Sequence, residues 1–166
     1  EPRILFHNNG NGTFSDVSAT AGPAITTSAS SRGLAIGDLW NDGRLSAVIS
    51  NMNAPPSLLV NEIGSANHWI AFRPIGSKSN RDGIGAQIKV KVGGRTLVAE
   101  VRSGSSYNSN SDMRPHFGLR QADKVDWVEV RWPSGLSERY VSLSSDAIHV
   151  LKEGSGTPNV DKKPPS

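Results

Sequence analysis

The most regular pattern in the chain is an alternation of apolar and polar positions. In residues 86–92 every second residue is aliphatic from Ile88 onward, and lysines lie between them. Gly93 and Gly94 separate this run from a second alternating run, residues 95–101. Alternation of period two is typical of a half-buried strand, and Gly-Gly suits a tight turn whose residues need positive φ. This stretch therefore predicts a β-hairpin.

A second hairpin is predicted further along the chain. Residues 126–132 and residues 138–143 alternate on either side of a Pro-Ser-Gly turn. Residues 69–73 and 147–151 are additional short strand candidates. At least six strands over residues 68–152, without any sustained helical periodicity, predict a small antiparallel β-sandwich or barrel.

The N-terminal part of the chain predicts β structure in shorter pieces. The candidate strands are residues 4–6, 13–17, 33–37, 47–51 and 57–61, and residues 19–31 are expected to form a loop. A few short strands without a second sheet cannot close a core, so this region is expected to be part of something larger. From residue 153 the composition is Gly, Ser, Thr, Pro, Lys and Asp, which predicts a disordered tail over residues 153–166.

Composition and charge narrow the class of protein. The 166 residues include no cysteine, which excludes thiol redox chemistry and thiolate zinc sites. No apolar run approaches the roughly 18 residues that a membrane-spanning helix needs. Residues 1–67 hold three basic and five acidic residues, whereas residues 68–152 hold thirteen and eight. The net charge changes sign between the two segments, which indicates two modules. The moderate excess of basic residues in the second module predicts a weakly basic surface rather than a dedicated nucleic-acid site.

Two ordered sets of motifs resemble known families. The segments that resemble an FG-GAP/VCBS-type repeat, the blade unit of integrin-α-like β-propellers, are residues 3–17, 37–46 and 56–61. Those that closely resemble the ASPIC/UnbV domain are residues 78–86, 102–107, 116–119 and 128–135. The pairing of the two is typical of the cartilage acidic protein-like family, which is secreted and includes many bacterial members.

The resemblance implies an all-β fold class: a partial β-propeller blade followed by a small antiparallel β-sandwich or barrel. The boundaries we expect are a blade fragment over residues 1–62, a linker over 63–67 and an ASPIC/UnbV-like domain over 68–152. The chain starts inside a repeat, which implies that the parent protein extends further toward its N-terminus. The resemblance also implies a secreted or cell-surface location, and the lack of cysteine fits a bacterial secreted β-protein.

An acidic loop is the candidate metal site. The resemblance to FG-GAP loops implies that Asp38, Asp42 and Ser46 stand at calcium-ligand positions, and calcium needs six to eight oxygen ligands. Trp40 occupies another ligand position and cannot coordinate, and Arg44 adds a positive charge. Two alternatives therefore stay open: a weak Ca²⁺ site, and the favoured metal-free loop held by side-chain hydrogen bonds.

Two polar loops carry the candidate ligand-binding residues. Residues 77–85 form one, and residues 103–114, rich in serine and asparagine, form the other. Arginine forks suit carboxylate or sulfate groups, tyrosine offers a stacking face, and small polar residues supply adaptable hydrogen bonds. The candidates are Arg81, Asp82, Arg102, Ser105, Tyr107, Asp112 and Arg114. The alternative is that both loops only fix strand register or connect strands.

Catalytic signals are weak, so we do not expect an enzyme. Asp112 and His116 lie near several serines, but no Gly-x-Ser-x-Gly elbow is present. We expect His116 to pack at the start of a strand. A hydrolase that uses these two residues is the least favoured hypothesis.

The leading functional hypothesis is a non-catalytic extracellular recognition, adhesion or assembly module at the C-terminus of a larger secreted protein. Its expected partner is a protein or glycan of the cell surface or matrix, and an unpaired blade edge predicts self-association. The alternative is polyanion or nucleic-acid binding by the basic second module, with Tyr107 and Trp127 among its basic residues. Nucleic acid is the less expected of these partners.

Overall fold

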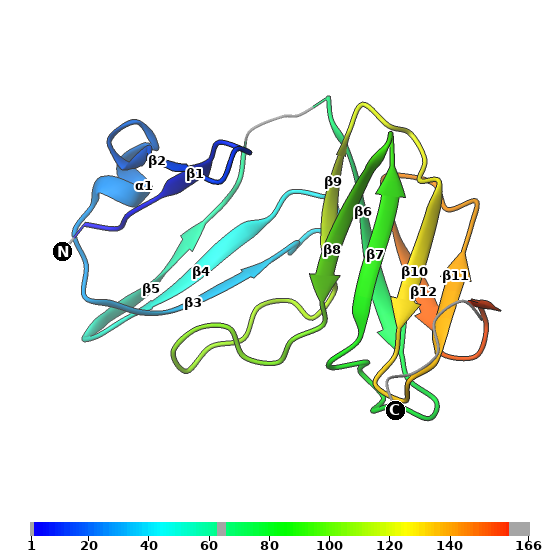
Figure 1. The fold of residues 1–166 in the computed structure, drawn as a ribbon. Coiled ribbons are helices and arrows are strands. Elements are labelled where there is room, and N and C mark those ends of the chain that lie inside the picture. Colours follow the sequence, from blue (N-terminus) through cyan, green and yellow to red (C-terminus); the bar gives the residue numbers. More distant parts are fainter. Residues whose placement is uncertain (1, 63–65, 160–166) are drawn as a thin grey trace.

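A computed structural model describes residues 2–62 and 66–159 of the chain. These residues form two β-rich lobes (Figure 1). We call residues 2–62 the N-terminal lobe. Its elements are β1 (Phe6–Asn8), β2 (Phe14–Asp16), the 3-10 helix η1 (Ser18–Thr20), α1 (Pro23–Thr26), β3 (Ser31–Gly37), β4 (Ser46–Asn51) and β5 (Ala54–Leu59). They form a two-stranded sheet, β1-β2, and a three-stranded antiparallel sheet, β3-β4-β5. The loop expected over residues 19–31 therefore contains two short helical turns.

Residues 66–159 form the second lobe, which we call the sandwich lobe. Its strands are β6 (His68–Ile75), β7 (Gln87–Val92), β8 (Arg95–Glu100), β9 (His116–Arg120), β10 (Trp127–Arg131), β11 (Ser137–Tyr140), β12 (Ala147–Lys152) and β13 (Thr157–Pro158). A five-stranded sheet in the order β13-β11-β10-β7-β8 packs in front of a three-stranded sheet in the order β12-β6-β9 (Figure 1). The all-β prediction is confirmed.

The core lies between these two sheets. On β7, Ile88, Val90 and Val92 are buried, and the lysines between them are half-buried on the outward face, as the alternation predicts. The inward residues of β6 are Ile70 and Phe72, which are fully buried. Both predicted hairpins are confirmed, because β7 pairs with β8 and β10 pairs with β11 in antiparallel register.

The strand pairing corrects one expectation. The second module is not purely antiparallel, because β12 runs parallel to β6, and its sheets form an open sandwich rather than a closed barrel. The chain crosses back from the five-stranded sheet before β12, and the pairing begins where both strands start. The Asp146 amide donates to the Trp69 carbonyl at 2.7 Å, so β12 enters the sheet at the same end as β6.

The expected disordered tail was also wrong for residues 153–159. Glu153 is 3 % exposed, and β13 adds to the edge of β11. The Glu138 carboxylate, 1 % exposed, accepts hydrogen bonds from the Gly154 and Gly156 amides and from the Trp132 indole. Hydrogen bonds to buried carboxylates therefore order this segment without an apolar anchor. Residues 160–166 of the predicted tail, and 63–65 of the predicted linker, lie outside the described residues.

The N-terminal lobe has hardly any core of its own. Among its large apolar side chains, only Ile49 is counted in the buried core, and thirteen are exposed. These thirteen are Ile4, Leu5, Phe6, Phe14, Leu34, Ile36, Leu39, Trp40, Leu45, Val48, Met52, Leu58 and Val60. The sandwich lobe exposes four: Val98, Tyr107, Val141 and Val150. The expectation that the strands of this region cannot bury a core alone agrees with this contrast.

Candidate functional site

A long polar loop of the sandwich lobe reaches across to the N-terminal lobe. Residues 103–114 follow the edge of β3, and Figure 1 shows the loop returning beneath that strand. The Leu34 amide donates to Ser106 Oγ at 3.2 Å, and the Ile36 amide donates to Ser111 Oγ at 3.1 Å. Ser109 Oγ donates to the Leu34 carbonyl at 2.9 Å. We call residues 103–114 the clasp loop.

The clasp loop satisfies backbone groups that a strand edge would otherwise leave open. Its Asp112 amide also donates to the Ile36 carbonyl at 2.8 Å. Unpaired edges of this kind are templates for pairing with another chain. Because the β3 edge is occupied, the predicted self-association through a blade edge now concerns β5, the other outer strand of this sheet.

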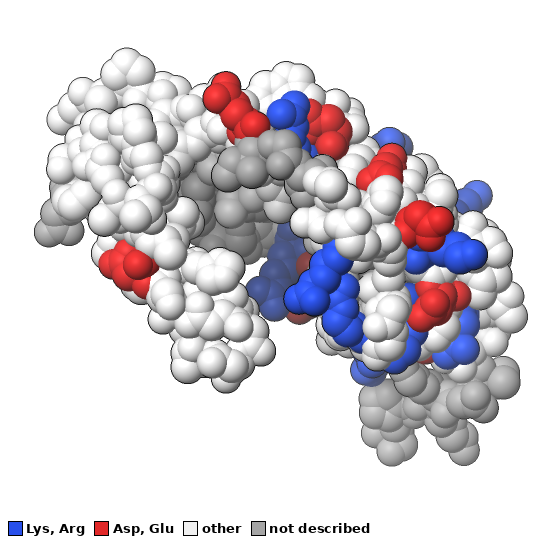
Figure 2. All heavy atoms as spheres, turned by 90° about the horizontal axis from the view of Figure 1, so that it is seen from above, with Lys and Arg blue, Asp and Glu red and all other residues white. Residues whose placement is uncertain are grey.

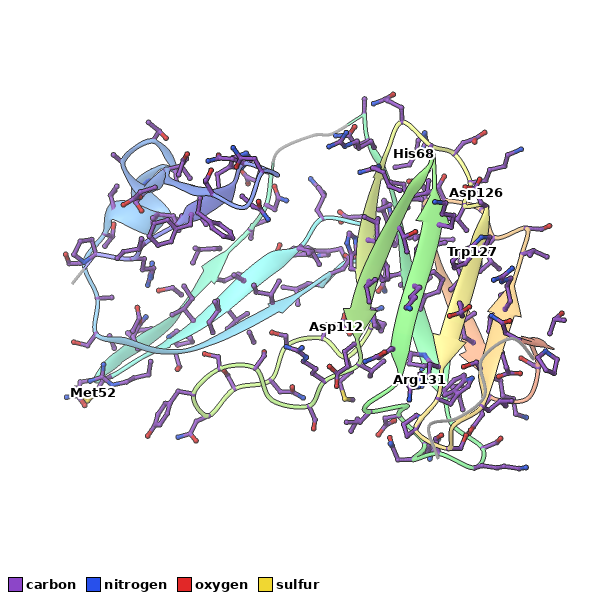
Figure 3. All side chains as sticks on the ribbon, viewed as in Figure 1. Met52, His68, Asp112, Asp126, Trp127 and Arg131 are labelled. Atoms are coloured by element: carbon purple, nitrogen blue, oxygen red, sulfur yellow. The ribbon has the colours of Figure 1, made fainter. Side chains whose placement is uncertain are left out.

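Arg114 fastens the end of the clasp loop to the acidic loop of the N-terminal lobe. Its guanidinium donates to Asn41 Oδ1 at 2.6 Å, to the Asp38 carbonyl at 3.0 Å and to the Asp112 carboxylate at 2.7 Å. Burial raises the pKa of Asp112, but hydrogen bonds from Arg114 outweigh that effect and lower the pKa overall. The two residues therefore form an ion pair within the clasp loop (Asp112 is labelled in Figure 3). The bonds from Arg114 to Asn41 and to the Asp38 carbonyl are the ones that bridge the two lobes.

Close backbone approach at two glycines completes the contact between the lobes. A Cβ at Gly43 would overlap the Trp69 indole, and Gly43 has a φ of 84°. A Cβ at Gly33 would lie 2.6 Å from the Tyr107 carbonyl oxygen. Trp69 in turn stacks on His116, with ring centroids 5.5 Å apart. Only glycine allows these surfaces to meet so closely.

The predicted metal ligands are engaged in hydrogen bonds within the N-terminal lobe. The Asp38 carboxylate accepts the amides of Asp42 and Gly43, at 3.1 and 2.8 Å. The Asp42 carboxylate accepts the Arg44 guanidinium, whose hydrogen bonds lower the pKa of Asp42. Ser46 Oγ accepts the Asn61 amide at 3.3 Å. No group of three or more metal-ligating side chains occurs in the described part of the chain, and calcium binding stays a prediction.

Four of the seven predicted ligand-binding residues come together in one groove. Arg81, Asp82, Asp112 and Arg114 line a hollow of about 250 Å³, together with Arg73 of β6 and the apolar residues Pro74, Ile75 and Met113. We call it the arginine groove. It is a polar surface that could take an anionic group, although binding there stays a prediction.

The other three predicted residues lie elsewhere. Arg102 is 3.4 Å from Glu100, and Ser105 Oγ is 3.1 Å from Ser111 Oγ within the clasp loop. Tyr107 is 67 % exposed on that loop. Trp127, on the outward face of the five-stranded sheet, is covered by the Arg139 guanidinium at 4.6 Å from its ring centroid. The structure therefore does not bring Tyr107 and Trp127 into one surface.

Sequence analysis missed Arg73, whose place in the predicted strand 69–73 marked it only as a polar strand position. Arg73 lies in the groove because three separate segments come together in the fold, and neither the composition nor the spacing of the sequence indicates which segments come together. The available signal was that Arg73 alternates with Ile70 and Phe72, which places it on the face of β6 opposite to the sandwich core, where Ala71 is nevertheless buried.

Asp112 and His116 border a space of only about 10 Å³, which is room for about one water molecule. His116 begins β9, as expected, and burial lowers its pKa. Its Nε2 atom is buried without a hydrogen-bond partner among the described residues. The space that these two residues share is therefore too small for a substrate, although His116 also lines a separate hollow of about 690 Å³ with Trp69, His68 and Asp146. The expectation of a non-catalytic chain stays a prediction.

Comparison with known proteins identifies the sandwich lobe. Residues 76–158 match the family described as ASPIC and UnbV, which is half of the chain. The chain belongs to the ASPIC and UnbV family. Within this family match lie the loop over residues 77–85, the clasp loop and β7 to β13, so the ASPIC/UnbV domain runs past residue 152, where sequence analysis ended it.

Two curated relatives are similar to the ASPIC/UnbV part of the chain. Cartilage acidic protein 1 of Mus musculus is 41 % identical over 76 residues, and cartilage acidic protein 1 of Homo sapiens is 38 % identical over 76 residues. In each case the match covers 46 % of this chain and 11 % of the relative. The chain thus spans about a tenth of the length of these relatives. The expected ASPIC/UnbV domain is confirmed, and the FG-GAP/VCBS repeat before it stays a prediction.

None of the described helices is long and apolar enough to cross a membrane.

Proposed function

We propose that this chain is a non-catalytic recognition and assembly module of a larger extracellular protein. The ASPIC/UnbV domain is the stable, self-contained part, and the N-terminal lobe is one blade-like unit of FG-GAP/VCBS type. The name of the curated relatives, cartilage acidic protein 1, supports an extracellular location as part of this proposal.

The observation that carries the assembly role is that the sheet β3-β4-β5 is apolar on both faces. Residues that pair across neighbouring strands share a face. Val48 pairs with Leu58, and both are exposed on one face. Leu34 and Ile36 are exposed on the other face, beside Ile49 of β4, which is buried. A sheet with two apolar faces needs a layer on each side, which is the situation of a blade between its neighbours.

Charge supports the same division of roles. Figure 2 shows Lys and Arg gathered on the sandwich lobe, whereas the visible face of the N-terminal lobe carries few charges of either sign. Exposed apolar patches without charge are typical of surfaces that pack against protein. Polar and cationic groups are typical of surfaces that select a ligand. The proposal therefore assigns assembly to the first lobe and recognition to the second.

Size-exclusion chromatography with light scattering, together with binding of an apolar dye, tests the assembly role. We expect the chain alone to bind the dye and to self-associate as its concentration rises. Val48→Lys with Leu58→Lys should reduce both signals several-fold, because two charges then interrupt the apolar face. Val98→Lys with Val150→Lys is the matched control on the sandwich lobe, and it should change neither signal.

The assembly role fails if the two pairs of variants behave alike. It also fails if the chain binds no dye and stays monomeric at every concentration tested. The melting temperature of each variant, followed by tryptophan fluorescence, establishes that the fold is retained.

A further inference from the structure

The arginine groove holds two guanidinium groups that the fold itself does not use. Arg114 is committed to Asp112, Asn41 and the Asp38 carbonyl. Neither Arg73 nor Arg81 has a side-chain hydrogen bond or ion pair to any residue that the structure describes, and both are exposed. Three arginines and two aspartates line the hollow, and Arg114 is balanced by Asp112, so Arg73, Arg81 and Asp82 leave one net positive charge there. An anion placed between Arg73 and Arg81 would be attracted by both guanidinium groups. The groove therefore favours a ligand with a negative charge.

The backbone beneath these arginines is held firmly. The Gly76 amide donates to the Arg81 carbonyl at 3.0 Å, and the Asn80 side chain bonds both the amide and the carbonyl of Ile84 at 2.8 Å. At Gly83, which has a φ of 65°, the loop lies so close to Pro74 that an added Cβ would be 2.9 Å from the Pro74 Cβ. Arg81 and Asp82 are thus presented on a rigid turn beside β6, which lowers the cost of ordering them around a ligand.

The Asp82 side chain places a second requirement on a ligand of the groove. Its carboxylate lines the groove, is exposed and, among the described residues, accepts no hydrogen bond. An ionised carboxylate only accepts hydrogen bonds, so a ligand that displaces the solvent around Asp82 has to replace its donors. A glutamate or aspartate side chain brings no donor of its own, so an acidic peptide could donate to Asp82 only through its backbone N–H groups. A sugar acid brings both an anionic group for the arginines and hydroxyl donors for Asp82.

We propose that the arginine groove binds an acidic sugar of the uronic acid class, with Arg73 and Arg81 on its carboxylate and Asp82 accepting from its hydroxyl groups. Pro74, Ile75 and Met113 provide the apolar surface against which the sugar ring packs. The hollow of about 250 Å³ is just below the usual range of ligand pockets, roughly 300–1,000 Å³, and so matches about one ring of a longer glycan. This inference rests on the proposed recognition role of the ASPIC/UnbV domain.

Calorimetric titration of the whole 166-residue chain with tetragalacturonate, at low ionic strength and pH 7, tests the proposal. We expect saturable binding of this probe and none of neutral maltotetraose. Arg73→Gln with Arg81→Gln should weaken binding by roughly tenfold or more, because two charge-assisted hydrogen-bonding groups are lost. The matched control, Lys89→Gln with Arg95→Gln, removes the same charge from the five-stranded sheet and should bind as the unmodified chain does.

Asp82→Ala separates recognition of a sugar acid from simple attraction of charge, because it removes both the hydrogen-bond acceptor and the negative charge. If Asp82 accepts hydroxyl groups, this variant should bind tetragalacturonate more weakly. If the groove only attracts anions, removing a negative charge should tighten binding, and this outcome would overturn the proposal. Tighter binding of poly-L-glutamate than of tetragalacturonate, lost in the double arginine variant, would also overturn it and would identify an acidic peptide as the ligand.

Two further outcomes count against the proposal. One is the absence of saturable tetragalacturonate binding, and the other is equal weakening by the arginine and control pairs. Neither outcome affects the assembly role of the N-terminal lobe, because the light-scattering and dye experiments use no sugar. Arg73 and Arg81 have no internal partners, so the double variant should melt as the unmodified chain does, which checks that it is folded.

Discussion

The two lobes contain similar strands but differ in how far the apolar side chains of those strands are covered. In the ASPIC/UnbV sandwich, alternating residues of two sheets face each other, and fourteen residues form one buried cluster. In the N-terminal lobe the strands alternate too, yet large apolar side chains stay exposed on both faces of β3-β4-β5. The comparison teaches that correct strand pairing does not make a domain. A sheet also needs a second layer to cover its apolar face, and among the described residues only the C-terminal half of the chain has one.

The largest difference between the lobes should be seen on truncating one apolar side chain in each. Phe72 is fully buried on β6, with its ring 5.8 Å from that of Phe117, whereas Leu58 on β5 is 53 % exposed. Phe72→Ala should lower the free energy of unfolding by about 3–5 kcal/mol through loss of burial and a residual cavity. Leu58→Ala should change it by about 0.5 kcal/mol or less. Urea unfolding followed by tryptophan fluorescence measures both, and similar losses would contradict the comparison.

The sandwich lobe is also held by buried carboxylates, and this makes it sensitive to acid. The Glu153 carboxylate accepts the amides of Ser77, Lys78 and Ser79 and the hydroxyls of Ser79 and Ser134. Burial alone would raise the pKa of Glu153, but these hydrogen bonds, with that of Ser134 foremost, lower it from 4.5 to about 2. Because the pKa is lowered in the folded state, the stabilisation is present above pH 4.5 and is lost as the pH falls toward 2.

Glu153→Gln should therefore lower the free energy of unfolding at pH 7 by roughly 2–3 kcal/mol. The difference between the two proteins should shrink as the pH falls from 4.5 toward 2, because protonated Glu153 then resembles the amide. Urea unfolding at several pH values measures this difference. A gap that stayed constant down to pH 2 would show that Glu153 does not titrate in this range.

The contact between the lobes should be weaker than either of these effects. Gly43→Ala forces a Cβ into the Trp69 indole at a φ of 84°. Gly10→Ala has nearly the same backbone cost, at a φ of 77°, but nothing within 4 Å of the new Cβ. We expect Gly43→Ala to cost about 1–3 kcal/mol and to speed hydrogen exchange of β3 and the clasp loop. Equal exchange in the two variants would mean that the lobes do not depend on this approach.

The periodic parts of the sandwich could be predicted from sequence, because alternation reports which residues face a core. The hairpins β7-β8 and β10-β11 follow directly from it. The direction of β12 could not be predicted, because pairing with β6 depends on where the chain crosses between sheets. Residues 153–159 were missed for a different reason: Glu138 and Glu153 anchor them by hydrogen bonds, so the segment shows no apolar signal.

The candidate site, too, could be predicted only in part from the sequence. The composition of the clasp loop fits ligand binding and strand connection equally well, and the structure assigns most of its serines to the backbone of β3. Arg81 and Asp82 were chosen from their loop, yet the groove becomes visible only when β6 brings Arg73 beside them. Sites assembled from three separate segments leave little trace in any one of them.

The smallest effect is expected from calcium, which tests how far the acidic loop has lost the function that its resemblance implies. Asp38 is occupied by two backbone amides and Asp42 by Arg44, so a cation would have to compete with hydrogen bonds already made. Calcium sites need six to eight oxygens with compensating negative charge, and this loop brings few carboxylates and one arginine. We expect 1 mM Ca²⁺ to shift the melting temperature by less than about 1 °C relative to a chelator, which corresponds to a dissociation constant no tighter than about 1 mM. Removing the competing cation with Arg44→Ala should increase the shift, because Asp42 is then free to coordinate. A large shift in the unmodified chain would instead show that the loop rearranges around the metal. A bound ion would then stabilise the N-terminal lobe, in part replacing the buried core that stabilises the sandwich lobe.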